Sequence, residues 1–317
     1  MLEEAFWYKK FSVGLALDTT FEEFEDLLNL YADYINNIYF SLPIGERFHN
    51  RFLVAQQYNN PEIVEMFWKM VRLIKRYGIK TEVVFNTRGL RKSDFDLAKK
   101  YVDANGIVVD KVGILDEYYD DVKIAFPKAH IVNSVNNMPN NIEDFSKLIH
   151  QYDEIVIGRH LIRDSKLIKY VDNVLDSKVV LLVNNGCSHT CGGCDSVEYC
   201  QYVYQRDIAK YSKSFIFAIQ SIFPYEFHEH YFDFSNVSYF KISTRTSNTK
   251  YIMKCLDSYI HNSTKEYIKL DRGNYYLWSR LGWHVDYFDE FEYEEIKKIK
   301  MEICKKGISI WEGNNKL

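Results

Sequence analysis

Long hydrophobic runs are missing from this sequence of 317 residues. No segment approaches the roughly 18 consecutive apolar residues that a membrane helix needs, so a membrane-spanning protein is not expected. The first ten residues include Glu3 and Glu4 and lack an apolar core, which is untypical of a secretory signal. The sequence therefore predicts a cytoplasmic protein.

An excess of charge of one sign is also missing. The formal net charge is −4 and the pI is about 6.2, so the overall charge does not indicate a nucleic-acid partner. The sequence contains no Walker motif, no GxGxxG, no GxSxG elbow and no HExxH. Nucleotide hydrolysis, Rossmann-type redox chemistry and the standard hydrolase mechanisms therefore have no support.

What the sequence does contain is 47% hydrophobic residues, arranged as short apolar runs that alternate with helical patterns. Eight such strand–helix units favour parallel pairing and a closed (β/α)8 barrel of the TIM type, with an open doubly wound sheet as the alternative. The expected strands are 11–18, 37–43, 80–86, 106–110, 130–136, 154–158, 179–183 and 238–245.

The barrel is expected to occupy residues 1–262, with 263–317 as a C-terminal helical appendage. The connection between the seventh and eighth strands is longer than an ordinary crossover, and residues 199–234 are rich in Tyr and Phe. This segment is expected to form either a lid over the barrel mouth or an aromatic packing layer. Its aromatic surface is also the candidate docking site for a protein partner.

Four of the six cysteines follow the seventh expected strand within fourteen positions. In a reducing compartment such a group favours a metal site over a disulfide framework. The spacing and the soft thiolate donors suit a 4Fe-4S cluster; a structural zinc ion, or thiols without metal, are the alternatives. The expected metal ligands are Cys187, Cys191, Cys194 and Cys200.

In a (β/α)8 barrel the loops that follow the strands form the active site. Amides and guanidinium groups at these positions suggest a small polar or anionic organic ligand. The expected substrate-binding residues are Asn86, Arg88, Asn133, Asn136, Arg159, Asn184, Lys241 and Arg245. His160 and Asp18 are the candidates for general acid–base catalysis, although Asp18 also suits a helix cap.

The eighth strand reads Phe240-Lys241-Ile242-Ser243-Thr244-Arg245, which resembles the Lys-Ile-Glu-Gly-Arg signature of the collagenase-like peptidase family. Ser134-Val135-Asn136 and the stretch 184–194 are also similar to that family. This chain departs from the pattern by having Ser243 and Thr244 in place of glutamate and glycine, and by having its cysteines close together, where that family's ligands are more dispersed.

The resemblance implies a (β/α)8-type core and cysteines that hold a 4Fe-4S cluster. For several members it implies oxygen-independent hydroxylation of ubiquinone precursors or RNA bases with prephenate as oxygen donor, while others are described as peptidases. Carried over, the four cysteines are cluster ligands, and Lys241 and Arg245 line the barrel mouth. The sequence thus predicts an iron-sulfur oxidoreductase or hydroxylase of this type.

Two alternatives stay open. Cys187, Cys191 and Cys194 have the CxxxCxxC spacing of radical S-adenosylmethionine enzymes, but here the motif follows the seventh strand instead of the first, and Gly193 stands where an aromatic residue is usual. The other alternative is a zinc-stapled barrel without catalytic activity that serves as an accessory or binding protein.

Overall fold

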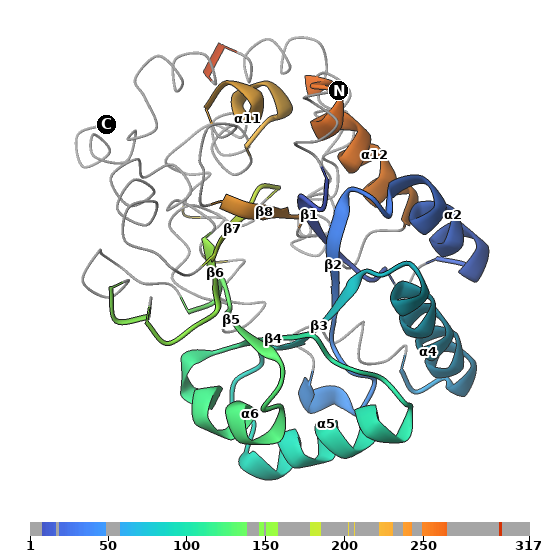
Figure 1. Ribbon diagram of the computed structural model, residues 1–317, viewed down its shortest axis with the longest axis vertical. Helices are drawn as coiled ribbons and strands as arrows, with labels where there is room; N and C mark the ends of the chain where they lie inside the picture. The colour runs from blue at the N-terminus through green and yellow to red at the C-terminus, as the bar shows by residue number, and fades with distance from the viewer. Residues whose placement is uncertain are drawn as a thin grey trace. The chain divides into compact units, whose positions relative to one another are not determined.

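The structure is a computed structural model of the full chain (Figure 1). It describes residues 8–16, 19–48, 58–137, 146–148, 150–157, 178–184, 202, 206, 222–230, 237–242, 249–264 and 298–299. The chain forms two compact units, and each is described by itself. Unit 1 is Met1–Val156 with Thr244–Met253, and unit 2 is Ile157–Ser243 with Lys254–Leu317.

Eight parallel strands form a closed barrel in the order of the sequence, which confirms the predicted (β/α)8 class. The strands are β1 (Phe11–Gly14), β2 (Ile35–Phe40), β3 (Lys80–Phe85), β4 (Lys111–Ile114), β5 (His130–Asn133), β6 (Glu154–Ile157), β7 (Lys178–Leu182) and β8 (Val237–Lys241). Each is only four to six residues long, and most of their residues are buried.

Helices cover the outside of strands β1 to β5 in unit 1 (Figure 1). They are α2 (Phe21–Tyr31), α4 (Pro61–Arg76), α5 (Lys92–Ala104) and α6 (Tyr119–Ala125), with the short 3-10 turns η1 (Glu46–Phe48) and η2 (Asp116–Tyr118). The sequence sets their starts. Thr20 forms a capping box with Glu23, and Asn60 caps α4 just before Pro61.

Aromatic side chains show which face of each strand points outward. Phe40 of β2 packs edge-on against Phe67 of α4 at a centroid distance of 5.3 Å. Phe85 of β3 packs in the same way against Phe95 of α5, also at 5.3 Å. Because side chains alternate along a strand, the neighbours of these phenylalanines point into the barrel. The inward residues of unit 1 therefore include Asn37 and Glu82.

In unit 2 the described elements are β7, β8, α11 (Pro224–His230) and α12 (Thr249–Ile260), of which α12 begins in unit 1. Phe227 of α11 packs against Phe240 of β8 at 4.2 Å and against Tyr259 of α12 at 5.7 Å. Phe227 and Phe223 are both fully buried, so these two aromatic side chains of the segment pack in the interior. Tyr202, by contrast, is 59% exposed.

The expected fourth strand, 106–110, is wrong. Residues 107–110 form a loop, and the strand begins at Lys111 and is followed by the 3-10 turn η2 and by α6. Gly106 adopts a positive φ of 67° at the end of α5, and Val108 is 67% exposed. The apolar run Ile107-Val108-Val109 suggested a strand, while the true strand opens with a charged residue that is buried.

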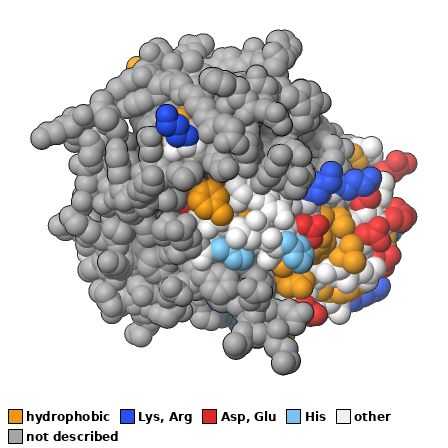
Figure 2. Space-filling view, turned by 90° about the horizontal axis from the view of Figure 1, so that it is seen from above, with side chains coloured by type: hydrophobic (Ala, Val, Ile, Leu, Met, Phe, Trp, Pro, Cys, Tyr) orange, Lys and Arg blue, Asp and Glu red, His pale blue; other side chains and the backbone are white. Residues whose placement is uncertain are grey.

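None of the helices that the structure describes is long and apolar enough to cross a membrane. On the face in Figure 2, described acidic and basic side chains both lie around the apolar side chains at the right of the view. Of the C-terminal appendage predicted for 263–317, only residues 263–264 and 298–299 are described, so that boundary stays a prediction.

Candidate functional site

The described candidate residues all lie at the carboxyl ends of barrel strands. Two follow β3, two belong to the end of β5 or the turn after it, and two stand at the ends of β7 and β8. They are Asn86, Arg88, Asn133, Asn136, Asn184 and Lys241. Asp18, Arg159, His160, Arg245, Cys187, Cys191, Cys194 and Cys200 lie outside the described residues.

Asn86 and Arg88 stand on the loop between β3 and α5. Asn86 continues the inward alternation of Glu82 and is half-buried, whereas Arg88 is exposed. The buried hydroxyl of Tyr118 holds this loop: it donates to the Thr87 carbonyl oxygen at 2.8 Å and accepts from the Leu90 amide at 3.1 Å. Burial raises the pKa of Tyr118 to about 12, so the phenol remains a donor at neutral pH.

Asn133 is buried but faces the other way. It pairs with Ile114 of β4 and Ile155 of β6, and these positions point toward the helix layer. The side-chain amide of Asn133 acts to lower the pKa of the Tyr152 hydroxyl. Neither amide atom, however, forms a well-aligned hydrogen bond with a described residue. Asn133 thus stands at the carboxyl end of β5 with its side chain turned away from the barrel interior.

Sequence reasoning missed a group of residues near Asn133 that joins the segment after β4 to the segment before β6. Tyr152 donates to Asp116 Oδ1 at 2.7 Å, and the Asp116 amide donates to Asn137 Oδ1 at 2.9 Å. Burial and the Asp116 carboxylate raise the pKa of Tyr152. Asn136 lies in the turn after β5, where its backbone amide donates to Ser134 Oγ at 3.3 Å. Asn136 and Asn137 are thus held by turn geometry, as asparagines after strands often are.

In unit 2, Asn184 and Lys241 share one face at the ends of β7 and β8. Leu182 pairs with Lys241, and the Val183 amide donates to the Lys241 carbonyl oxygen at 3.0 Å. Since Phe240 points outward onto α11, Lys241 points inward, and Asn184 has the same orientation as Leu182. Asn184 is 1% exposed. An amide and a cation therefore occupy the ends of β7 and β8, and the cysteines follow β7 in the sequence.

The metal site predicted at the four cysteines falls outside the described residues. Among the residues that are described, no group of three or more His, Cys, Asp or Glu side chains has an arrangement suited to a metal ion. Cys255 is buried in α12 and forms no disulfide.

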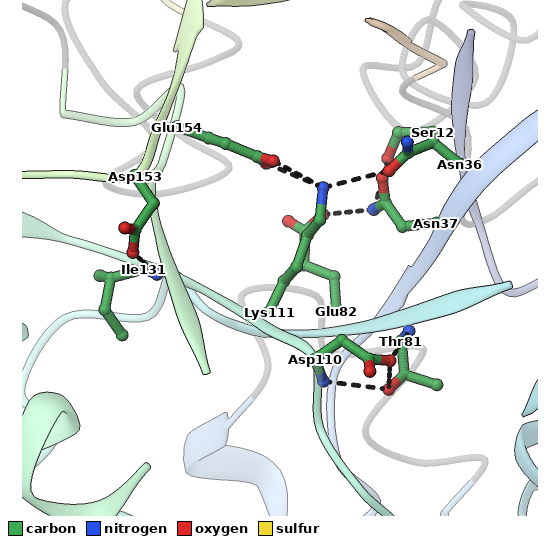
Figure 3. Close-up of polar contacts among 10 residues, drawn as sticks. All are labelled: Ser12, Asn36, Asn37, Thr81, Glu82, Asp110, Lys111, Ile131, Asp153 and Glu154. Atoms are coloured by element: carbon green, nitrogen blue, oxygen red, sulfur yellow. Dashed lines mark hydrogen bonds and ion pairs between the residues drawn. The ribbon is translucent and has the colours of Figure 1, made fainter. Parts of the chain in front are cut away.

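A second polar group, not predicted from the sequence, fills the barrel interior at the amino ends of the strands (Figure 3). We call it the amino-end cluster: Ser12, Asn36, Asn37, Glu82, Lys111 and Glu154. The Nδ2 group of Asn37 donates to Ser12 Oγ at 2.9 Å and to Glu82 Oε2 at 2.6 Å. Asn37 is fully buried, and its Oδ1 atom has no hydrogen-bond partner among the described residues.

The centre of the amino-end cluster is a buried ion pair. Lys111 Nζ lies 2.8 Å from Glu154 Oε1 and 3.0 Å from Oε2, and it also donates to Asn36 Oδ1 at 3.2 Å. The Lys111 and Glu154 side chains are 1% and 4% exposed. Burial lowers the pKa of Lys111, and the Glu154 carboxylate offsets part of this effect. Active sites of such barrels form at the opposite, carboxyl end, so this position favours a structural role.

No protein-family model matches the sequence. No match was found among curated proteins. Solved structures with a similar chain path include the U32 peptidase Mk0906, with 14% identity, a TM-score of 0.44, and coverage of 74% of this chain and 92% of that one.

The tryptophan synthase α subunit from Legionella pneumophila is another similar structure, with 10% identity, a TM-score of 0.40, and coverage of 86% and 92%. A mutant α subunit of the same enzyme from Pyrococcus furiosus has 8% identity, a TM-score of 0.41, and coverage of 86% and 96%. At such low TM-scores these likenesses carry no argument about activity, and the barrel rests on its own strand pairings.

Proposed function

We propose that this chain is an iron-sulfur enzyme of the collagenase-like peptidase type, which performs redox or oxygen-independent hydroxylation chemistry on a polar, anionic organic ligand. The observation that carries the proposal is the position of β7. This buried strand ends at Leu182, and four cysteines follow it in the sequence between positions 187 and 200. In a parallel barrel the segments after the strands surround the substrate.

The polar residues at the carboxyl ends support the ligand class. Lys241 and Asn184 supply a cation and an amide in unit 2, and Asn86 and Arg88 supply an amide and a guanidinium group in unit 1. Cationic and amide donors of this kind bind carboxylate or phosphate groups. Arg159 and Arg245 are assigned the same role, and His160 and Asp18 are assigned proton transfer.

The donor set fits the proposed cofactor. Four thiolates are the usual ligands of a 4Fe-4S cluster, and Cys187, Cys191, Cys194 and Cys200 would hold it. When bound, such a cluster supplies one-electron redox chemistry or orders the surrounding loop. The protein's own contribution is to bind and orient the ligand, a role that we assign in unit 2 to Asn184 and Lys241.

Metal analysis of cysteine variants after anaerobic purification tests this proposal. Cys191→Ser and Cys200→Ser should each lose iron, acid-labile sulfide and the sulfide-to-iron charge-transfer absorbance. Cys255→Ala is the matched control, because this thiol is buried in α12 and belongs to no metal group in the described structure, so its iron content should stay at the wild-type level.

Other results select the alternatives. If Cys200→Ser keeps full iron while Cys191→Ser loses it, three thiolates bind the cluster, as in radical S-adenosylmethionine enzymes. If zinc replaces iron in every preparation, the chain is the zinc-stapled binding protein. Full iron in the Cys191→Ser variant contradicts the ligand assignment.

A further inference from the structure

In unit 1 the distribution of apolar residues along the strands does little to determine which side chains face into the barrel. β6 reads Glu154-Ile155-Val156-Ile157, and all four residues are buried. In β5, Ile131 and Val132 point to opposite faces and are both 1% exposed. A strand that is apolar on both faces gives up little burial when it slips by one residue, although every side chain then changes face.

The amino-end cluster does distinguish the two faces. Glu82, Lys111 and Glu154 are the buried charged side chains that strands β3, β4 and β6 direct into the barrel, and they meet there. A one-residue slip moves a strand by about 3.3 Å and turns its charged residue outward. The outward face at this level is the helix layer, which Val83, Val112 and Ile155 line with apolar side chains.

The contacts of the cluster also join strands in series. Asn37 links β2 to β1 through Ser12 and to β3 through Glu82. Lys111 links β4 to β2 through Asn36, and to β6 through Glu154 across the intervening β5. A slip of β2, β3, β4 or β6 alone therefore leaves at least one charged or amide group buried without its partner, which is costly.

We propose that the amino-end cluster fixes the register of the barrel strands in unit 1. It selects one inward face for strands whose apolar residues would accept either. This role is independent of the cysteines and of any ligand, because every contact that it requires lies among Ser12, Asn36, Asn37, Glu82, Lys111 and Glu154.

The test is a neutral variant that keeps the size of the cluster but removes its charges: Glu82→Gln, Lys111→Met and Glu154→Leu in one full-length chain. The Glu82→Gln change retains a side-chain oxygen that can accept from Asn37. We expect wild-type helix content by circular dichroism, but several backbone amide signals for single residues of β3, β4 and β6 in NMR spectra. We also expect the m-value, which is the slope of the unfolding free energy against denaturant concentration, to fall by about a third or more, because several registers coexist.

Lys99→Ala with Asp103→Ala is the matched control, since it removes an exposed ion pair on α5 with side chains that are 38% and 56% exposed. It should keep one signal per residue. One sharp set of strand signals in the triple variant, together with an unchanged m-value, would overturn the proposal. If the triple variant unfolds in buffer, the spectra are recorded in a stabilising osmolyte, which favours compact states without restoring the ion pair; a single register there also overturns it.

Discussion

Lys111 and Glu154 form an ion pair inside the barrel, with Nζ 2.8 Å from Oε1 and both side chains almost completely buried. They open strands β4 and β6, and β5 lies between them. A charge buried this deeply is tolerated only when it is paired, because transfer from water to the interior opposes ionisation. The pair therefore makes each partner dependent on the other.

Removal of one partner should destabilise the protein strongly. Lys111→Met leaves Glu154 buried without its cation, and we expect a loss of about 3–5 kcal/mol in the free energy of unfolding. Urea titration followed by circular dichroism measures it. Restoring most of the loss by adding Glu154→Leu to Lys111→Met would confirm that the unpaired carboxylate is the cause. A loss below about 1 kcal/mol for the single variant, the range of exposed pairs, would show that solvent reaches the pair.

Gly113 of β4 lies next to the Glu82 side chain. A Cβ atom at Gly113 would stand 3.0 Å from Glu82 Oε1, so Gly113→Ala requires the buried carboxylate to move. We expect a loss of about 1–3 kcal/mol from this overpacking. Adding Glu82→Gln should relieve little of it, since Gln has the same length. Thermal unfolding of both variants measures the effect, and an unchanged melting temperature for Gly113→Ala would show that Glu82 has room to move.

Tyr118 holds the loop that carries Asn86 and Arg88. Tyr118→Phe removes the hydroxyl that pairs with the Leu90 amide and the Thr87 carbonyl oxygen, at a cost of about 1–3 kcal/mol for buried groups left unpaired. Hydrogen exchange should become faster at the Leu90 amide, with no change at Phe24 in α2. Equal exchange at Leu90 in the variant and the wild type would contradict this role.

Asp110 should make stability depend on pH in the acid range. Burial opposes its ionisation, but hydrogen bonds from Lys75 Nζ at 2.7 Å and the Thr81 amide at 2.7 Å outweigh this, so the pKa of Asp110 is lower than usual. Its stabilising contribution is therefore present above the unfolded-state pKa of about 4 and is lost as pH falls through the lower folded-state value.

Asp110→Asn tests this dependence. The pair is partly exposed, so we expect a loss of only about 1 kcal/mol near neutral pH, and a smaller difference from wild type near pH 3. Urea midpoints at both pH values provide the measurement. Lys75→Met is the comparison variant, because it removes the ion pair and leaves the hydrogen bonds from Thr81 in place. A difference that stays constant with pH would exclude the Asp110 carboxylate as its source.

The barrel was predictable from the sequence because its strands are short apolar runs separated by helices with clear caps. The position of β4 was not, because exposed Val108 and buried Lys111 reverse the usual rule for apolar and charged residues. The same reversal concealed the amino-end cluster, since Glu82, Lys111 and Glu154 are typical of strand boundaries when only the sequence is considered. Partners distant in sequence decide their burial.

The candidate site shows the same limit. Sequence reasoning placed Asn86 and Asn184 correctly at strand ends, since the end of an apolar run marks the end of a strand, whereas Lys241, expected inside strand 238–245, is the last residue of β8. It did not predict that Asn133 faces the helix layer, because the facing of a side chain depends on strand register. Register in turn depends on contacts such as Asn37 with Glu82, which no local pattern reveals.

The central claim is that thiolates following β7 bind an iron-sulfur cluster, and quantification of metal and sulfide in the wild-type chain after anaerobic purification tests it most directly. The account predicts about four iron atoms and about four acid-labile sulfides per chain. Zinc as the bound metal, or a chain with all four cysteines reduced and neither iron nor sulfide after anaerobic reconstitution, would contradict it.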